Sequence, residues 1–579
     1  MQIIDWAGLL LVACGTAVAA ELPIVDLGYQ RHQAIGFNST GRYYQFSNIR
    51  YAEPPLGPLR FALPVPPRNR TNEVVNGKGL GNICPQSQAC WFNVQSQFVS
   101  AVTERSTFNF TAAYDQVYQQ DGCTKPRPVA DQNPLESEDC LFLDVYVPEK
   151  VISKQRDRKA KPNPGAPVLV YFQDGAYVSG SKSDQNPSGL IATSKEDGSS
   201  GIIYVGVNYR CTFVSCSFSG LYGNGVDQLG AFGWLSGQKF RSAGGVPNAG
   251  LYDERLALEW VQRHIAKFGG DPSRVTVMGV SAGGGSITMQ LTAYGRAIRP
   301  PFAQIIAQSP AWEPGTKTPA IEDDLLDRFL TLLNVSSVEE ARRLPSQALL
   351  DANYELVASR PYGSGVFGPA IDGDFVPDSP KRLLLERKVD PSVRILTSYT
   401  ANEGFMLAPA NVTSDATFNR YVDVLVHSAN ASVRAHVAQV LYPPIFNGSW
   451  PYRSQHERAN LLWSELSTTC NTRYLHRAVA TPGYAIEYAV APAMHLSDTS
   501  SVFYNGQGSD SSLNATIAQL MQRQIVQFVK TGNPNSKGDP HVPLYHEKAH
   551  VLSLGDDGVR VKLALTNTDR CAYWEQVDF

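Results

Sequence analysis

The residue most suited to covalent chemistry is a serine set among glycines. Residues 279–283 read Gly-Val-Ser-Ala-Gly, which is the G-x-S-x-G pattern centred on Ser281. The strand-like run Val275–Met278 precedes the pattern and a helix-like run follows it. In this context the chain turns so sharply that the flanking residues must be nearly free of side chain, and the serine hydroxyl is left exposed. The pattern therefore predicts Ser281 as a nucleophile, with a structural Gly-Ser turn as the alternative.

A serine nucleophile needs a base and a group that orients the base, and after such a turn the acid precedes the histidine along the chain. Glu403 stands where a strand-like run meets a glycine turn, and His495 follows the strand-like run Tyr484–Val490. Parallel sheets carry catalytic groups in the loops after their strands. We therefore predict His495 as the base and Glu403 as the acid, although Glu403 also fits a solvated surface carboxylate. Six other downstream histidines are interpreted as exposed loop residues (His541, His546, His550) or helix surface (His427, His436, His476).

The elements that would hold these groups alternate between strand and helix. The apolar runs Val168–Phe172 and Ile202–Val207 precede an amphipathic segment, Asp253–Lys267, and the strand before Ser281 follows it. That alternation is typical of an α/β protein with a mostly parallel sheet and crossover helices. Trp260 and His264 fit the core and the flank of the helix. No repeat or linker divides the chain, so we expect one catalytic domain over residues 21–579.

The overall composition excludes several classes of protein. Hydrophobic residues make up 43% of the 579 residues and charged residues 18%, which is an ordinary globular balance. A net charge of −3 provides no electrostatic footprint for nucleic acid. After the N-terminal segment there is no apolar run long enough to span a membrane. The cysteines form no C-x-x-C metal pair, and the expected chemistry requires neither a metal nor an organic cofactor.

Residues 1–20 have an apolar stretch followed by Ala-Val-Ala-Ala, which resembles a signal peptide, although no basic residue precedes the stretch. Two features agree with the secretion that this segment predicts. Its removal leaves an even number of cysteines, as expected for disulfides: Cys84, Cys90, Cys123, Cys140, Cys211, Cys216, Cys470 and Cys571. N-x-[ST] sequons for glycosylation occur at Asn38, Asn69, Asn109, Asn334, Asn411, Asn430, Asn447 and Asn514. We therefore expect a secreted, extracellular glycoprotein.

The motifs of the chain together resemble the type-B carboxylesterase and lipase family, the cholinesterase-like α/β-hydrolases, and especially its secreted fungal members. The resemblance covers nearly the whole mature chain. Besides the contexts of Ser281, Glu403 and His495, it rests on residues 51–61, 137–145, 268–272 and 371–375. It implies an α/β-hydrolase fold, which is a large central, mostly parallel sheet flanked by helices. It also implies that these three residues are the nucleophile, the acid and the base of a catalytic triad.

The resemblance locates the oxyanion hole in the segment Gln173–Tyr177, where the family usually has H-G-G-G-F. The donors implied are the backbone N–H groups of Gly175, Ala176 and Ala282. In this loop the methyl group of Ala176 narrows the space beside the acyl carbon, and Asp174 brings a carboxylate nearby.

Other departures from the family concern substrate choice and the orientation of the acid. Val280 stands where the family commonly has Glu, and Ala130 aligns with the tryptophan that cholinesterases use to bind choline. A choline ester is therefore not expected as the substrate. Ala311 replaces a serine that often supports the acid, so we expect another group to orient Glu403.

The resemblance also implies two disulfides: Cys84 with Cys140, closing a flap near the active-site gorge, and Cys470 with Cys571. Cys90 and Cys123 are available for a bridge inside the flap, and Cys211 and Cys216 for a small loop of their own, but the sequence does not fix the connectivity of these four. The flap is long and rich in apolar residues: Trp91, Phe92, Phe98, Val99, Phe108, Phe110, Tyr114 and Tyr118. These residues either pack a folded insertion or form a lipase-like lid that contacts a lipid interface.

The function predicted is the hydrolysis of a small-molecule carboxylic ester through an acyl-enzyme, as in a carboxylesterase or lipase. A transesterase or acyltransferase would use the same triad and replace water by an alcohol. A non-catalytic binding protein of the cholinesterase-like type is the alternative from another class. The sequence leaves the ester and the oligomeric state open.

Overall fold

The computed structural model describes residues 21–68, 73–78, 81–87, 89–125, 133–156, 164–177, 180–210, 230–312, 317–365, 367–506, 513–545 and 548–577. The predicted signal segment, Asn69, Ala130, Cys211, Cys216 and His546 lie outside these ranges. Among the described residues, no helix is long and apolar enough to cross a membrane.

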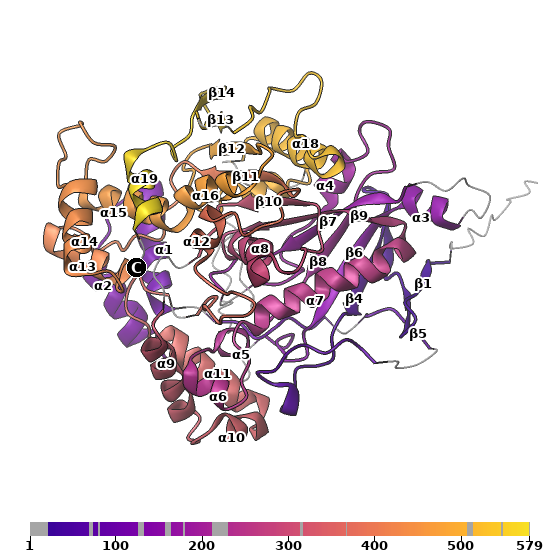
Figure 1. Cartoon of the computed structure of the whole chain (residues 1–579), viewed down its shortest axis with the longest axis horizontal. Coiled ribbons are helices and arrows are strands. Elements are labelled where there is room, and N and C mark those ends of the chain that lie inside the picture. Colours follow the sequence, from indigo (N-terminus) through magenta and orange to yellow (C-terminus); the bar gives the residue numbers. More distant parts are fainter. Residues whose placement is uncertain are drawn as a thin grey trace, which may run out of the picture.

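A large sheet organises the chain, and it confirms the predicted α/β architecture (Figure 1). Within the described part of the chain the sheet has 11 strands in the order β14-β13-β12-β11-β10-β9-β7-β8-β6-β4-β3. In this order, every pair of neighbouring strands between β13 and β8 is parallel. The pairs outside this stretch, at both ends of the sheet, are antiparallel. Its strands are β3 (Gly36–Asn38), β4 (Tyr43–Arg50), β6 (Phe142–Pro148), β7 (Ala166–Phe172), β8 (Ile203–Val207), β9 (Gly270–Val280), β10 (Gln304–Gln308), β11 (Arg394–Thr400), β12 (Tyr484–Ala489), β13 (His550–Gly555) and β14 (Gly558–Leu563). A second, small sheet consists of β1 (Ile24–Asp26), β2 (Arg31–Gln33) and β5 (Val74–Val75), and its strand β2 contacts β4.

Helices surround the sheet, and the two longest, α7 and α18, pack on its opposite faces. The helices are α1 (Cys90–Thr103), α2 (Phe110–Asp115), α3 (Glu149–Arg156), α4 (Ser188–Thr193), α5 (Ala231–Trp234), α6 (Gln238–Ser242), α7 (Ala249–His264), α8 (Ala282–Thr292), α9 (Pro319–Leu332), α10 (Val338–Arg343), α11 (Ser346–Ala358), α12 (Pro380–Leu385), α13 (Asp415–Leu425), α14 (Ala431–His436), α15 (Gln455–Ser464), α16 (Cys470–Ala478), α17 (Thr499–Val502), α18 (Ala515–Thr531) and α19 (Asp569–Gln576).

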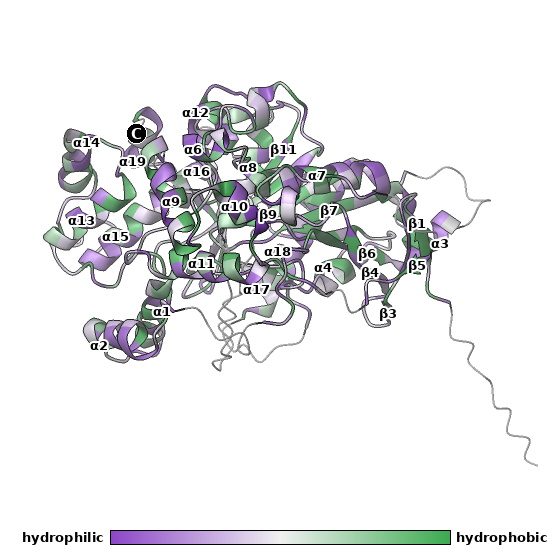
Figure 2. Ribbon diagram, turned by 90° about the horizontal axis from the view of Figure 1, so that it is seen from below, coloured by the Kyte–Doolittle hydropathy of each residue, from purple (hydrophilic) through white to green (hydrophobic). Residues whose placement is uncertain are grey.

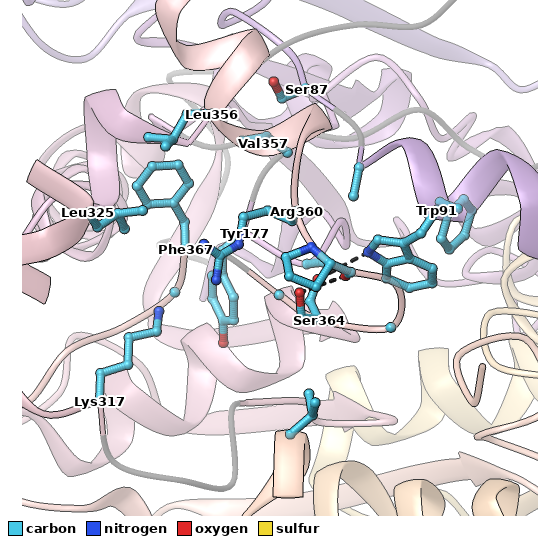
Figure 3. Close-up of a pocket in the computed structure, with 18 of the residues that line it drawn as sticks. Ser87, Trp91, Tyr177, Lys317, Leu325, Leu356, Val357, Arg360, Ser364 and Phe367 are labelled. Atoms are coloured by element: carbon cyan, nitrogen blue, oxygen red, sulfur yellow. Dashed lines mark hydrogen bonds between the residues drawn. The ribbon is translucent and has the colours of Figure 1, made fainter. Parts of the chain in front are cut away.

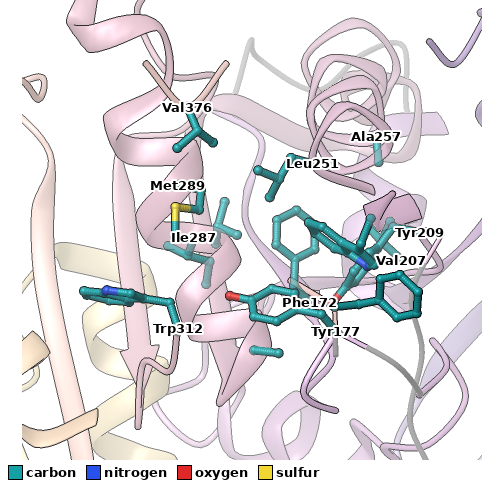
Figure 4. Close-up of a cluster of buried hydrophobic side chains, with 14 of the residues drawn as sticks. Phe172, Tyr177, Val207, Tyr209, Leu251, Ala257, Ile287, Met289, Trp312 and Val376 are labelled. Carbon is teal, nitrogen blue, oxygen red and sulfur yellow. The ribbon is translucent and has the colours of Figure 1, made fainter. Parts of the chain in front are cut away.

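Strand β7 shows how the sheet separates two cores. Because side chains alternate along a strand, Val168 and Val170 join one hydrophobic cluster, which includes α7 and α8 residues such as Leu251 and Ile287 (Figure 4). Leu169 and Tyr171 belong to a second cluster, which includes residues of α4 and α18. The strand is therefore apolar along its whole length, as expected for a strand covered on both faces. Figure 2 shows the same concentration of hydrophobic residues along β6 and β7.

The predicted helix 253–267 is confirmed, but it begins earlier, as α7. It ends in a 3-10 turn, Ile265–Phe268, where Gly269 adopts a φ of +86° that disfavours other residues. Trp260 is buried and donates through Nε1 to Tyr29 Oη at 2.9 Å, while His264 is half-buried at the flank. Both residues therefore have the structural roles that the sequence indicated.

Among the described residues there are three disulfides: Cys84–Cys140, Cys90–Cys123 and Cys470–Cys571. The first and last are the pairings that the family resemblance implied. The Cys90–Cys123 bridge closes the inner part of the flap, which folds into α1, α2 and a π-helical turn, Gln116–Gln120.

The interpretation of three histidines was wrong. His476 is buried rather than on the helix surface, because α16 packs on β11: its ring stacks on Tyr545 and its Nε2 is 2.9 Å from Thr397 Oγ1. His550 is the first residue of strand β13 rather than part of an exposed loop. His427 follows α13 and lines a large cavity. The burial of His476 depends on packing between distant segments, which a local pattern does not reveal.

Candidate active site

Ser281 occupies the predicted sharp turn, directly between β9 and α8. Its φ of +56° and ψ of −121° lie outside the regions favoured by non-glycine residues, and such strain is typical of functional positions. A Cβ atom at Gly279 would lie 2.8 Å from Phe172 O, and one at Gly283 would lie 2.4 Å from the same oxygen. The flanking glycines are therefore required because the turn presses against the end of β7.

The structure brings His495 and Glu403 to the serine from later strands. Glu403 follows the end of β11, and His495 follows the end of β12. His495 Nε2 lies 2.7 Å from Ser281 Oγ, and His495 Nδ1 hydrogen-bonds Glu403 Oε2. Because a carboxylate only accepts, Nδ1 carries the proton toward Glu403 and Nε2 is left to accept the serine hydroxyl. All three side chains are buried, which strengthens their mutual interactions.

Glu403 is held by two donors besides the imidazole. Ser309 Oγ donates to Glu403 Oε1 at 2.6 Å, and the backbone N–H of Thr400 donates to the same oxygen at 2.7 Å. Ser309 therefore supplies the orientation that we expected from a group other than Ala311. The sequence reasoning missed it, although its position directly after strand β10 was a signal.

The segment expected to form the oxyanion hole has an unusual backbone. Gly175, Ala176 and Tyr177 have successive φ angles of +114°, +51° and +60°, and only two residues separate them from the end of β7. Such a run curls the chain and turns consecutive N–H groups toward one side, as in other anion-binding concavities. Tyr177 Oη donates to Ala311 O at 3.0 Å, which ties the loop to the segment after β10. Gly175, Ala176 and Ala282 all line the same cavity as Ser281.

Two further carboxylates are buried close to the imidazole. Burial, together with the charge of Asp184, raises the pKa of Asp174 to about 7. Burial and the charge of Glu403 raise the pKa of Asp498 to about 6. His495 lowers the pKa of both carboxyl groups, because a nearby imidazolium favours the charged carboxylate. At neutral pH the carboxyl group of Asp174 is therefore about half protonated, whereas that of Asp498 is mostly ionised and adds negative charge near the histidine.

Ser281 and His495 open into a cavity of about 1230 Å³. Figure 3 shows other residues that line it, among them Trp91, Tyr177 and Phe367. Its walls include α1 from the flap and the exposed side of α9. The aromatic residues that line it are Trp91, Phe92, Tyr177, Trp312, Phe367 and Trp463. A largely apolar cavity with a few convergent polar groups is the usual form of a small-molecule site. Over the described ranges, no group of three or more His, Cys, Asp or Glu side chains is arranged to hold a metal ion.

A parallel sheet that carries a serine at a strand–helix turn, with an acid and a histidine after later strands, defines the α/β-hydrolase class. Comparison with known proteins agrees. The model of the carboxylesterase family matches residues 30–225 and 228–574. Carboxylesterase patB of Penicillium expansum is 88% identical over 579 residues, which is 100% of both chains. Carboxylesterase patB of Aspergillus clavatus is 66% identical and covers 99% of each chain.

Among solved structures, EstA of Aspergillus niger superposes with a TM-score of 0.74 at 24% identity, covering 96% of this chain and 98% of that one. This likeness supports the fold. The chain belongs to the type-B carboxylesterase family, and its class is that of carboxylic ester hydrolases.

Proposed function

We propose that the protein hydrolyses small-molecule carboxylic esters through an acyl-enzyme on Ser281, with His495 as base and Glu403 as acid. The observation that supports this most is the single imidazole that contacts both Ser281 Oγ and the Glu403 carboxylate. A non-catalytic binding protein would have no need to keep this buried arrangement together with a strained nucleophile turn.

In the first step His495 Nε2 takes the proton of Ser281 as Oγ bonds to the ester carbonyl carbon, and the carbonyl electron pair moves to oxygen. The N–H groups of Gly175, Ala176 and Ala282 stabilise this oxyanion. When the oxyanion collapses, the bond to the leaving oxygen breaks and His495 protonates the alcohol. Water then repeats the attack with His495 as base, which releases the carboxylic acid and restores Ser281.

The test is a panel of p-nitrophenyl esters of rising chain length, assayed with the wild-type protein and Ser281→Ala. We expect the variant to lose at least about 1,000-fold in kcat. A fluorophosphonate should label the wild-type peptide that contains Ser281 and leave the variant unlabelled. Full activity or labelling of Ser281→Ala would refute the proposed function.

Transfer of the acyl group to an alcohol is the second candidate. The cavity exceeds the volume usual for a site that holds one small ligand, so an acceptor alcohol has room beside the acyl group. A competing alcohol added to the assay distinguishes the reactions, because a strict hydrolase yields only the carboxylic acid whereas a transferase forms a new ester.

The flap supports a soluble ester as substrate rather than a lipid aggregate, since its helix α1 is held in place. Gln95 Nε2 donates to Ala408 O at 2.9 Å, while Gln95 Oε1 accepts from Tyr362 Oη at 2.7 Å and from Ala410 N at 3.1 Å. Trp91 Nε1 donates to Ser364 O at 3.1 Å. A helix with these bonds and an inner disulfide forms a wall of the cavity.

The other aromatic residues of the flap also pack inward. Phe98 contacts Phe405 and His456, while Phe108, Phe110 and Tyr118 join a small cluster around Cys90. With this wall fixed, the rate should level off with ester concentration and show no jump where the ester passes its solubility limit. A jump would instead identify the flap as a lipid-contacting lid.

We further propose that residues 1–20 are a signal peptide and that the mature protein is secreted and glycosylated. Three disulfides favour an oxidising compartment. Of the sequons that the structure describes, Asn109, Asn334, Asn430 and Asn447 are exposed, whereas Asn38, Asn411 and Asn514 are half-buried. Sequencing the N-terminus of the secreted protein should give Glu21, and endoglycosidase treatment should increase its mobility on a gel. An intact N-terminus in protein recovered from the cells would contradict this.

A further inference from the structure

The end of strand β10 contacts the segments that carry all three proposed triad residues. The carbonyl oxygen of Gln308 accepts from the backbone N–H of Ser281 at 3.0 Å. The next residue, Ser309, donates to Glu403. The side chain of Gln308 donates through Nε2 to Asp498 Oδ2 at 2.9 Å, and Asp498 lies three residues after His495. Two consecutive residues therefore connect the nucleophile turn, the acid and the histidine segment.

Asp498 directly follows the turn that carries His495. Backbone bonds join Ser497 N to Met494 O at 2.9 Å and Thr499 N to Leu496 O at 3.0 Å, so the segment is a continuous set of turns. The carbonyl oxygen of Asp498 then accepts from Val502 N at 2.9 Å at the start of α17. A shift of Asp498 relative to β10 would therefore move the imidazole relative to Ser281.

The burial of Asp498 is costly for a purely structural residue. Its side chain is fully buried, and its Oδ1 atom has no hydrogen-bond partner among the described residues. An apolar residue of similar size would avoid that desolvation penalty, so the carboxylate requires another explanation. The imidazolium that forms on His495 during the reaction provides this explanation, because its positive charge attracts the carboxylate of Asp498.

We propose that Asp498 is a positioning residue for His495, held in register by Gln308, and that its negative charge stabilises the imidazolium. This inference rests on the proposed triad, because it assigns His495 the role of the base. In the part of the chain that the structure describes, the imidazole also has Glu403, after β11, and Asp174, after β7, near it, with Asp184 beyond Asp174. The indole of Trp463 packs edge-on against the imidazole, with 5.6 Å between ring centroids.

The test compares Gln308→Leu, Asp498→Leu and the double variant with Gln304→Leu as the matched control. Gln304 is a buried glutamine at the opposite end of β10, where its Nε2 donates to Thr276 Oγ1 at 2.8 Å. We expect Asp498→Leu to lower kcat by about 10- to 100-fold with little change in KM, because a displaced base slows only the chemical step. The double variant should lose no more than Asp498→Leu alone, since both changes remove one contact.

Asp498→Asn separates charge from geometry. It keeps an acceptor oxygen for Gln308 but removes the charge, so kcat should stay well above that of Asp498→Leu. The acid limb of kcat/KM should move to lower pH, because the imidazolium loses a neighbouring anion that favours protonation. A purely structural role for Asp498 would leave this limb in place.

Three results would each overturn the inference. The double variant could lose as much kcat as the two single losses combined, Gln304→Leu could lose as much kcat as Asp498→Leu, or the acid limb could stay in place in Asp498→Asn. Ser281→Ala is assayed in parallel. If that variant is active, the proposed function fails; if it is inactive while the Asp498 variants match the wild type, only the role of Asp498 fails.

Discussion

Replacing Ser309 by alanine tests the support of the acid most directly. The change removes one of three donors to Glu403, the hydroxyl at 2.6 Å, and retains Thr400 N and His495. A buried hydrogen bond to a charged group contributes about 1.5–3 kcal/mol, so the free energy of unfolding should fall by about 2 kcal/mol at neutral pH. The carboxylate is charged in both the free enzyme and the transition state, so most of that free energy cancels in kcat. We expect kcat to fall by only about 3- to 10-fold, mainly through looser orientation of His495.

The assay measures kcat, KM and the thermal midpoint of Ser309→Ala beside Ser398→Ala. Ser398 is a buried residue of β11 whose hydroxyl has no hydrogen-bond partner among the described residues, so the control removes the same atom without removing a bond. The control should keep wild-type kcat and stability. An unchanged kcat and midpoint in Ser309→Ala would show that its hydroxyl does not support Glu403, and a loss above about 1,000-fold would place Ser309 in the chemistry itself.

Three other variants test separate features. Ala176→Gly should relieve about 1 kcal/mol of left-handed backbone strain and raise kcat/KM for branched acyl esters relative to acetate; a lower preference for branched esters would contradict the predicted crowding. Burial raises the pKa of Glu254 to about 8, so this residue costs the folded state stability as pH rises from about 4.5 to 8, and Glu254→Gln should flatten that decline in thermal midpoint. If the thermal midpoint fell equally with pH in the wild type and in Glu254→Gln, Glu254 would not be the cause of the decline. Replacing Cys90 and Cys123 together by serine opens a 33-residue loop and should cost about 3–4 kcal/mol, detected as faster proteolysis of the flap; unchanged cleavage would mean that the bridge is not needed there.

The nucleophile turn was the most predictable part of the site from the sequence. Ser281 sits between its strand and helix, with the required glycines on both sides, because that geometry is set within a few residues. The apolar runs that became β7 and β8 were equally clear, since strands covered on both faces need continuous apolar sequence. The positions of Glu403 and His495 were harder, and their order along the chain together with the family resemblance selected them.

The groups that support the triad were not predictable in this way. Ser309 and Gln308 reach Glu403 and Asp498 across 94 and 190 residues of sequence, so no local pattern links them. His476 was misplaced for the same reason, since its burial depends on Tyr545, a partner far along the chain. These contacts arise only when the sheet aligns strands that are distant in sequence.

The residues proposed to carry out the reaction and those that would select the substrate come from different parts of the fold. The segment proposed as the oxyanion hole follows β7, the proposed nucleophile Ser281 follows β9, and Ser309 follows β10. The proposed acid Glu403 follows β11, and the proposed base His495 follows β12. These five strands run parallel, so their carboxyl ends meet at one edge and the chemical groups converge there. Much of the cavity wall comes instead from helices outside the sheet, among them α1 and α9. Changes in α1 or α9 can therefore alter which ester binds while the catalytic geometry stays fixed, whereas changes at the strand ends act on the rate of the chemical step.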